Sequence, residues 1–111
     1  MHISDEALIA YLTLYEGRQY YRRGNGAEYT YRLEPAARPN DRMPYKIVFH
    51  SVEWEKDHEI APCFAVECLD MYNRGLKGPE KYVAKTGAHS PSRRGKYMLE
   101  LLRDVEAKMR S

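Results

Sequence analysis

The chain has 111 residues, a formal net charge of +2, 43% hydrophobic residues and 31% charged residues. These totals fit one domain over residues 1–111 with one small core, and they argue against a membrane span, because no apolar run approaches the roughly 18–20 residues that a span needs. An N-terminus that carries Asp5 and Glu6 is unlike a secretory signal, and two cysteines do not make a disulfide framework, so we expect a cytoplasmic protein with reduced thiols.

The first predicted element is a helix over about residues 5–16. Ser4 can cap it, because a hydroxyl there accepts a hydrogen bond from the first turn, and Asp5 and Glu6 suit the positive end of the helix dipole. Gly17 supplies the stop. The apolar residues recur at helical spacing: Leu8, Ile9, Tyr11, Leu12 and Tyr15.

A β-hairpin is predicted next, over residues 18–34. The triplet Gly24-Asn25-Gly26 tolerates the positive φ angles of tight turns. Tyr29, Tyr31 and Leu33 alternate with polar residues and so share one strand face. The alternative is that the first helix continues through Tyr21, which leaves one strand here.

The middle of the chain reads as a loop, a strand and a polar connection. Three prolines predict a loop over residues 35–44. Residues 45–54 form the clearest strand pattern, with Tyr45, Ile47 and Phe49 on one face. The polar residues 55–59 are interpreted as a connection.

Residues 60–72 fit two structures. Phe64, Val66 and Cys68 alternate as in a strand, whereas Ala65 and Leu69 also fit a helical face. We favour the strand, because the glycine-containing residues 73–79 then form a loop into a short strand at Lys81–Lys85.

A helix is predicted at the end of the chain, after a capping Ser92. Its apolar residues recur every three or four positions, from Tyr97 and Met98 through Leu101, Leu102 and Val105 to Met109. The predicted fold is therefore α+β: an antiparallel β-meander of four to five strands packed against an N-terminal and a C-terminal helix.

Ten tyrosines and eleven arginines are the most distinctive part of the composition. Both residue types are enriched where protein surfaces meet partners. The predicted hairpin interleaves them, which makes it a candidate partner-binding surface with four leading residues: Arg18, Tyr20, Arg22 and Tyr31. For Tyr31 a place in the core is an equal alternative, since one strand face has to be buried.

A second candidate surface is the basic segment, residues 74–96, which contains seven cations and one acid, Glu80. Such a segment creates a local positive field, although a solvated loop has the same composition. Its candidate partner-binding residues are Lys77, Lys81, Lys85, Arg93, Arg94 and Lys96.

No metal site, cofactor or catalytic motif is predicted. Cys63 and Cys68 are five residues apart, unlike the close pairs of zinc sites, so they read with His50 and His58 as structural residues. An acidic edge of Glu53, Glu55, Asp57 and Glu59 has only a faint likeness to the Asp…Glu-x-Glu-Lys pattern of metal-dependent nucleases.

These observations favour a small non-catalytic binding protein that occludes or recruits a macromolecular partner, a protein or nucleoprotein complex. Inhibitors and adaptors encoded by phages and mobile elements are analogous in size and composition. The alternatives are direct binding of nucleic acid by the basic segment and a small metal-dependent nuclease that uses the acidic edge.

Overall fold

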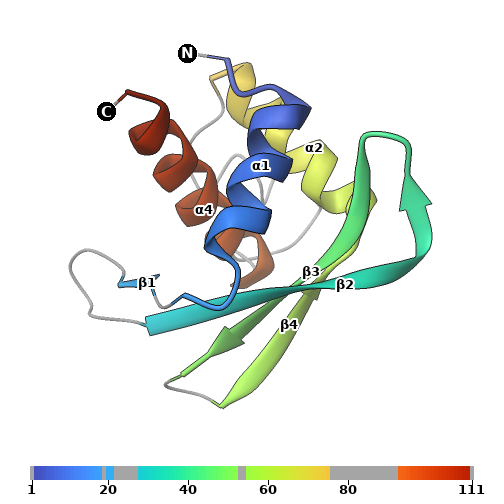
Figure 1. Ribbon diagram of the computed structural model, residues 1–111, viewed down its shortest axis with the longest axis vertical. Coiled ribbons are helices and arrows are strands. Elements are labelled where there is room, and N and C mark those ends of the chain that lie inside the picture. The colour runs from blue at the N-terminus through green and yellow to red at the C-terminus, as the bar shows by residue number, and fades with distance from the viewer. Residues whose placement is uncertain (1, 19, 22–27, 53–54, 76–92, 111) are drawn as a thin grey trace.

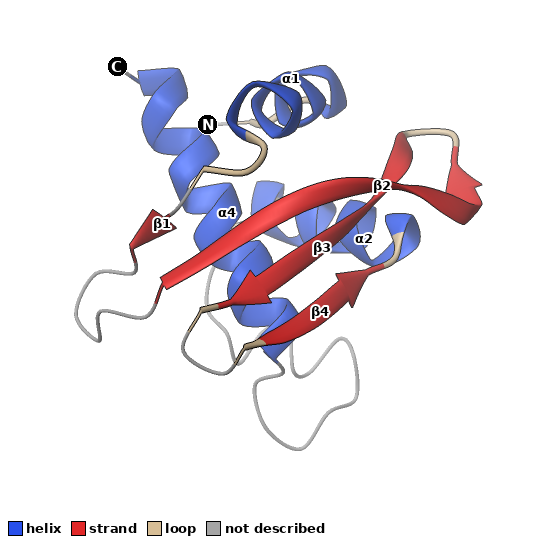
Figure 2. Ribbon diagram, turned by 60° about the horizontal axis from the view of Figure 1, so that its bottom comes forward, coloured by secondary structure: helices blue, strands red, loops and turns tan. Residues whose placement is uncertain are grey.

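The computed structural model describes residues 2–18, 20–21, 28–52, 55–75 and 93–110. Within these ranges the chain is an α+β protein with three helices and an antiparallel sheet. Figures 1 and 2 show the helices on one face of the sheet. In chain order the elements are α1 (Asp5–Tyr15), β1 (Tyr20–Tyr21), β2 (Glu28–Asn40), β3 (Met43–Ser51), β4 (Lys56–Ile60), α2 (Pro62–Asn73) and α4 (Arg93–Arg110).

The body of the sheet consists of β2, β3 and β4, and the two-residue β1 pairs with the start of β2 at its outer edge. Tyr31 lies opposite Phe49, and Phe49 lies opposite His58, so these side chains share the face that the helices cover. The next residues along each strand face away from the helices. One face of the sheet thus belongs to the core, as expected for a two-layer α+β protein.

The helix predicted over residues 5–16 is confirmed as α1. The Ser4 Oγ accepts a hydrogen bond from the Ala7 amide at 3.1 Å, which caps the first turn. Beyond the last turn, Gly17 has a φ of +82°, a conformation that favours glycine.

The prediction of a loop over residues 35–44 is wrong. Residues up to Asn40 belong to β2, and only Asp41 and Arg42 form the turn before β3. Prolines break central strands because they lack an N–H, but the outer edge of β2 at Pro35 is paired with no described strand, and there a missing N–H costs no ladder hydrogen bond.

The polar connection predicted at residues 55–59 is also wrong, because residues 56–60 form β4. Among the described strands it pairs only with β3, and Lys56, Asp57 and Glu59 are exposed at the edge of the described sheet. Charged residues are common on such edges, which they protect from pairing with other chains.

Residues 60–72 were expected to form a strand, but residues 62–73 form the helix α2. Pro62 occupies the first turn, where a proline is well tolerated. The helix packs on the sheet and on α4, so it buries a wide face: Pro62, Ala65, Val66, Cys68, Leu69, Met71 and Tyr72. A helix covered on two sides loses the narrow periodicity that separates a helix from a strand in sequence.

The predicted C-terminal helix is confirmed as α4, with Leu101 and Leu102 fully buried. The predicted strand Lys81–Lys85 and the turn at residues 24–26 lie outside the described residues. α2 therefore adds a third helix, one absent from the predicted arrangement, to the layer that covers the sheet.

Tyrosine supplies much of the core. Of the seven tyrosines whose burial is described, five are buried: Tyr11, Tyr29, Tyr31, Tyr72 and Tyr97. Tyr31 donates its hydroxyl proton to the Leu12 carbonyl of α1 at 2.8 Å, and Tyr72 donates to the Glu106 carboxylate of α4 at 2.9 Å. Burial, with that hydrogen bond second, raises the pKa of Tyr72 to about 12.

Candidate functional site

Not all of the residues assigned to the predicted hairpin surface are exposed. Tyr31 has 1% of its area exposed and hydrogen-bonds to α1, so it belongs to the core, and its assignment to the partner-binding surface is corrected. Arg18 is exposed, and its guanidinium lies 4.9 Å from the centre of the Tyr15 ring. Tyr20 lies in β1 opposite Tyr29. Arg22 lies outside the described residues.

The basic segment is described only at its ends. Lys77, Lys81 and Lys85 lie outside the described residues. Arg93 is the first residue of α4, Arg94 is exposed in its first turn, and Lys96 is half-buried.

These two ends of the basic segment are far apart. Tyr72, beside Arg74, contacts Glu106 near the end of α4, and Glu106 lies about 18 Å along the helix axis from Arg94 at 1.5 Å per residue. Arg74 and Arg94 therefore contribute to different parts of the surface, and together they form no single positive patch.

The acidic edge is engaged by cations of the chain itself. Asp57 accepts hydrogen bonds from Arg32 at 3.1 Å and pairs with the His50 ring at 2.7 Å, and Glu59 pairs with Lys46 at 2.5 Å. The pKa of Asp57 is lowered, first by the hydrogen bond from His50 and then by that from Arg32.

These pairs cover the sheet face that is opposite the helices. Val48 lies between Arg32 and Glu59 in the register, yet only 1% of it is exposed, because the stems of its charged neighbours shield it. Asp57 and Glu59, two acids of the edge that was compared with metal-dependent nucleases, thus pair with neighbouring cations and form part of the polar surface of the sheet. Glu53 lies outside the described residues.

The histidines and cysteines do not converge in the part of the chain that the structure describes, where no cluster of three potential metal ligands occurs. Cys63 is exposed, whereas Cys68 is buried in α2. Burial raises the pKa of the Cys68 thiol to about 12, so it remains protonated at neutral pH.

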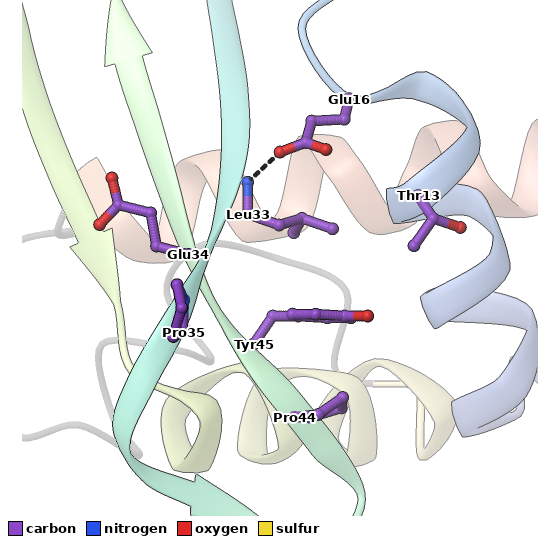
Figure 3. Close-up of a pocket in the computed structure, with 7 residues that line it drawn as sticks. All are labelled: Thr13, Glu16, Leu33, Glu34, Pro35, Pro44 and Tyr45. Carbon is purple, nitrogen blue, oxygen red and sulfur yellow. Dashed lines mark hydrogen bonds between the residues drawn. The ribbon is translucent and has the colours of Figure 1, made fainter.

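A groove with apolar walls lies between α1 and the β2–β3 hairpin, and it was not predicted from the sequence. It has a volume of about 370 Å³. Its lining comes from three elements, shown in Figure 3: Thr13 and Glu16 from the end of α1, Leu33, Glu34 and Pro35 from β2, and Pro44 and Tyr45 from β3.

The groove presents apolar side chains that are only partly covered. Leu33 and Tyr45 pack against the edge of the core but remain half-exposed, and Pro35 and Pro44 are exposed. In Figure 3 the Tyr45 ring extends from β3 toward α1, while the Glu34 side chain points away on the other side of β2. The floor is therefore apolar, and Thr13 of α1 stands opposite it.

Glu16 closes one end of the groove. Its Oε2 accepts a hydrogen bond from the Leu33 amide at 2.6 Å (Figure 3). One residue later, the Gly17 amide donates to the Tyr31 carbonyl at 3.0 Å. The chain that leaves α1 thus satisfies the outer edge of β2 as far as Leu33.

One sequence signal points to this groove. The alternation of Tyr45, Ile47 and Phe49 places Tyr45 on the core face of β3, where its ring packs only partly against the core. An aromatic ring at that position is left half-covered. Because residues 35–44 were predicted to form a loop, the neighbouring wall that β2 forms was not expected.

Comparisons of the chain with protein-family models, with curated proteins and with solved structures gave no match. Among the described helices, none combines the length and apolar character needed to cross a membrane.

Proposed function

We propose that this protein is a small non-catalytic binding protein that occludes or recruits a macromolecular partner, as an inhibitor or adaptor does. The groove between α1 and the hairpin is the observation that carries the proposal. Proteins use half-exposed apolar and aromatic groups in a preformed concave site to bind partners, since covering them removes apolar surface from water. Tyr45 and Leu33 are such groups.

The proposed site of action is the cytoplasm. Cys63 and Cys68 are both free thiols and form no disulfide with each other. A reducing compartment keeps such thiols in this state.

The experiment that tests the function is affinity capture from the native host with the full chain as bait, with and without nuclease treatment. Two bait variants are matched. Thr13→Arg places a long charged side chain in the groove, whereas Leu14→Arg places the same side chain on the adjacent residue of α1, which has 61% exposure and does not line the groove.

The expected result is a partner that survives nuclease treatment, forms a stoichiometric complex when both proteins are purified, and is lost with Thr13→Arg but kept with Leu14→Arg. A purified partner that binds both variants alike would remove the groove as the binding site. Failure to form any stoichiometric complex would contradict the function.

A second candidate function is direct binding of nucleic acid. It is favoured by two cations that the fold brings to one ring: Arg18 and Lys108 lie 4.9 Å and 5.3 Å from the Tyr15 ring centre. Both side chains are exposed, and cations near aromatic rings are common in single-strand binding sites. A partner whose retention is abolished by nuclease treatment would support this function in place of the first.

A further inference from the structure

The outer edge of β2 has partners as far as the Leu33 amide, and the described residues supply none beyond it. In an antiparallel strand, alternate residues direct both backbone groups to the same side. Tyr29 pairs with β1, the Tyr31 carbonyl accepts from Gly17, and the Leu33 amide donates to Glu16. The backbone groups of these residues, and by the same alternation those of Pro35, therefore point to the outer edge of the sheet. No described strand pairs with this edge beyond Tyr29.

The Glu16 carboxylate occupies the position that a neighbouring strand would fill. A paired residue on such a strand would accept the Leu33 N–H with its carbonyl oxygen, and the carboxylate oxygen at 2.6 Å now does so. Glu16 is an exposed residue at the end of α1, so its side chain can leave for solvent without disturbing the core.

The groove lies beside this edge. Directly paired residues in a sheet place their side chains on the same face. A residue paired with Leu33 would therefore direct its side chain to the helix side of the sheet, where Tyr45 and Thr13 line the groove (Figure 3). An apolar side chain there covers the exposed parts of Leu33 and Tyr45.

We propose that the β2 edge at Leu33 and Pro35 takes up an extended segment of a partner protein as an added strand, with an apolar side chain of that segment in the groove beside α1. This inference rests on the proposed function and names its mode of recognition, in which backbone hydrogen bonds provide affinity and the groove provides specificity.

Pro35 limits what the edge accepts. It has a carbonyl oxygen for a partner's N–H but no N–H of its own. Once the Glu16 carboxylate has left, the edge offers a complete hydrogen-bonded pair at Leu33 and only an acceptor two residues later. An interrupted edge of this kind resists indiscriminate pairing with other strands, so binding has to gain from the groove as well.

The test uses a displayed library of random 12-residue peptides, selected on the immobilised full chain, followed by affinity measurements on synthetic peptides. The expected ligands carry an apolar residue within an extended sequence and lose affinity at least tenfold for Thr13→Arg but not for Leu14→Arg. Methylating successive peptide amides one at a time should weaken binding with a period of two, since only alternate amides face β2.

A pair of Glu16 variants separates strand addition from simple occupation of the groove. Glu16→Gln keeps an acceptor for the Leu33 N–H, whereas Glu16→Ala leaves that N–H open. Strand addition predicts that Glu16→Ala binds about threefold to tenfold tighter than Glu16→Gln, because no internal hydrogen bond has to be displaced. In NMR spectra of the wild type, the Leu33 amide should shift and gain protection from exchange on peptide binding.

Failure to enrich any peptide, equal binding to Thr13→Arg and Leu14→Arg, or equal binding to the two Glu16 variants without a period of two would each overturn the inference. The proposed function would survive these results if a folded partner still formed a stoichiometric complex. A chain that dimerises in solution and loses its dimer with Thr13→Arg would instead identify a second copy as the occupant.

Discussion

Tyr31 shows what a tyrosine hydroxyl contributes when its ring is buried. The hydroxyl donates to the Leu12 carbonyl at 2.8 Å, and this bond links β2 to α1 inside the core. We predict that Tyr31→Phe lowers the free energy of unfolding by about 0.5–1.5 kcal/mol, because the bond is lost and its acceptor stays buried. Urea denaturation measures the change.

Tyr45→Phe is the matched control. The Tyr45 ring is half-buried, and the described residues offer the Tyr45 hydroxyl no hydrogen bond. The same loss of stability in both variants would contradict the assigned role of the Tyr31 hydroxyl.

Asp57 and Glu59 lead to a prediction about metal. Their carboxylates already pair with Arg32, His50 and Lys46. We predict that magnesium or manganese does not raise the melting temperature beyond an ionic-strength control. A ligand at 100 times its dissociation constant would stabilise the fold by about 2.7 kcal/mol. A specific rise that disappears in Glu59→Gln would contradict the prediction and favour the nuclease alternative.

Single residues also mark the limit of what the sequence could predict. The cap at Ser4 was predictable because the capping hydroxyl and the amide that it accepts from are three residues apart. Leu12, the acceptor of the Tyr31 hydroxyl, lies 19 residues from it in sequence, and Arg32 lies 25 residues from Asp57. No local pattern identifies partners at such distances.

At the scale of elements, α4 docks on the sheet and on α2 through a wide apolar face. Leu101 is fully buried, and Phe49 and Tyr97 stack with ring centres 5.3 Å apart. We predict that Leu101→Ala destabilises the protein by about 2–4 kcal/mol, through lost burial and a cavity. Met109→Ala on the same helix, where 41% of the side chain is exposed, should change stability by less than about 0.5 kcal/mol. Thermal melts of the two variants check both values, and equal melting temperatures would argue against this docking.

Arg42 joins the tip of the β2–β3 hairpin to two helices. Its guanidinium donates to Asp5 of α1 at 2.9 Å and to Asp70 of α2 at 2.8 Å. The hydrogen bonding from Arg42 to the Asp70 carboxylate is the largest cause of the lowered pKa of Asp70. Because all three groups are partly exposed and solvent screens them, Arg42→Gln should cost only about 0.5–1 kcal/mol at pH 7.

The pH dependence of that difference has a definite sign. A lowered folded pKa gives stability that is complete above the ordinary aspartate pKa of about 3.9 and is lost as the pH falls through the folded value. The gap between wild type and Arg42→Gln should therefore close in acid. Urea midpoints at neutral and acidic pH measure it, with the exposed Arg38→Gln in the same hairpin as control. A gap that widens in acid would refute the role of Asp70.

The elements predicted correctly are those whose start, periodicity or end is specified by residues close together in the sequence. α1 has its cap, its periodicity and its glycine stop within about a dozen residues, and α4 has a long regular face. The errors occur where tertiary context overrides composition. Pro35 is tolerated in β2 because the outer edge is open there, and α2 has a strand-like alternation because two neighbours bury it.

At the scale of the whole molecule, the positive charge is spread over separate regions. The groove was not predictable either, since its walls come from α1, β2 and β3 and meet only after folding. Arg18 and Lys108 likewise meet at Tyr15 from positions 90 residues apart, as the residue numbers show. Composition indicated the residue types of a candidate binding surface, but their positions depend on the packing of the layers.

Arg94 provides the last test, because it is exposed in the first turn of α4, where the helix dipole is unfavourable for a cation. We predict that Arg94→Glu, alone or with Arg93→Glu, leaves the melting temperature unchanged or slightly raised. If nucleic acid is the partner, the wild type should bind a single-stranded oligonucleotide with steep salt dependence, and the variant more weakly and less steeply. Arg74→Glu, just after the end of α2, is the charge-matched control, because Tyr72 of α2 contacts α4 at Glu106, about 18 Å along the helix axis from Arg94. Equal affinities for all three proteins would exclude the α4 N-terminal region from nucleic-acid binding and leave Arg18 and Lys108 beside Tyr15 as the candidate nucleic-acid site.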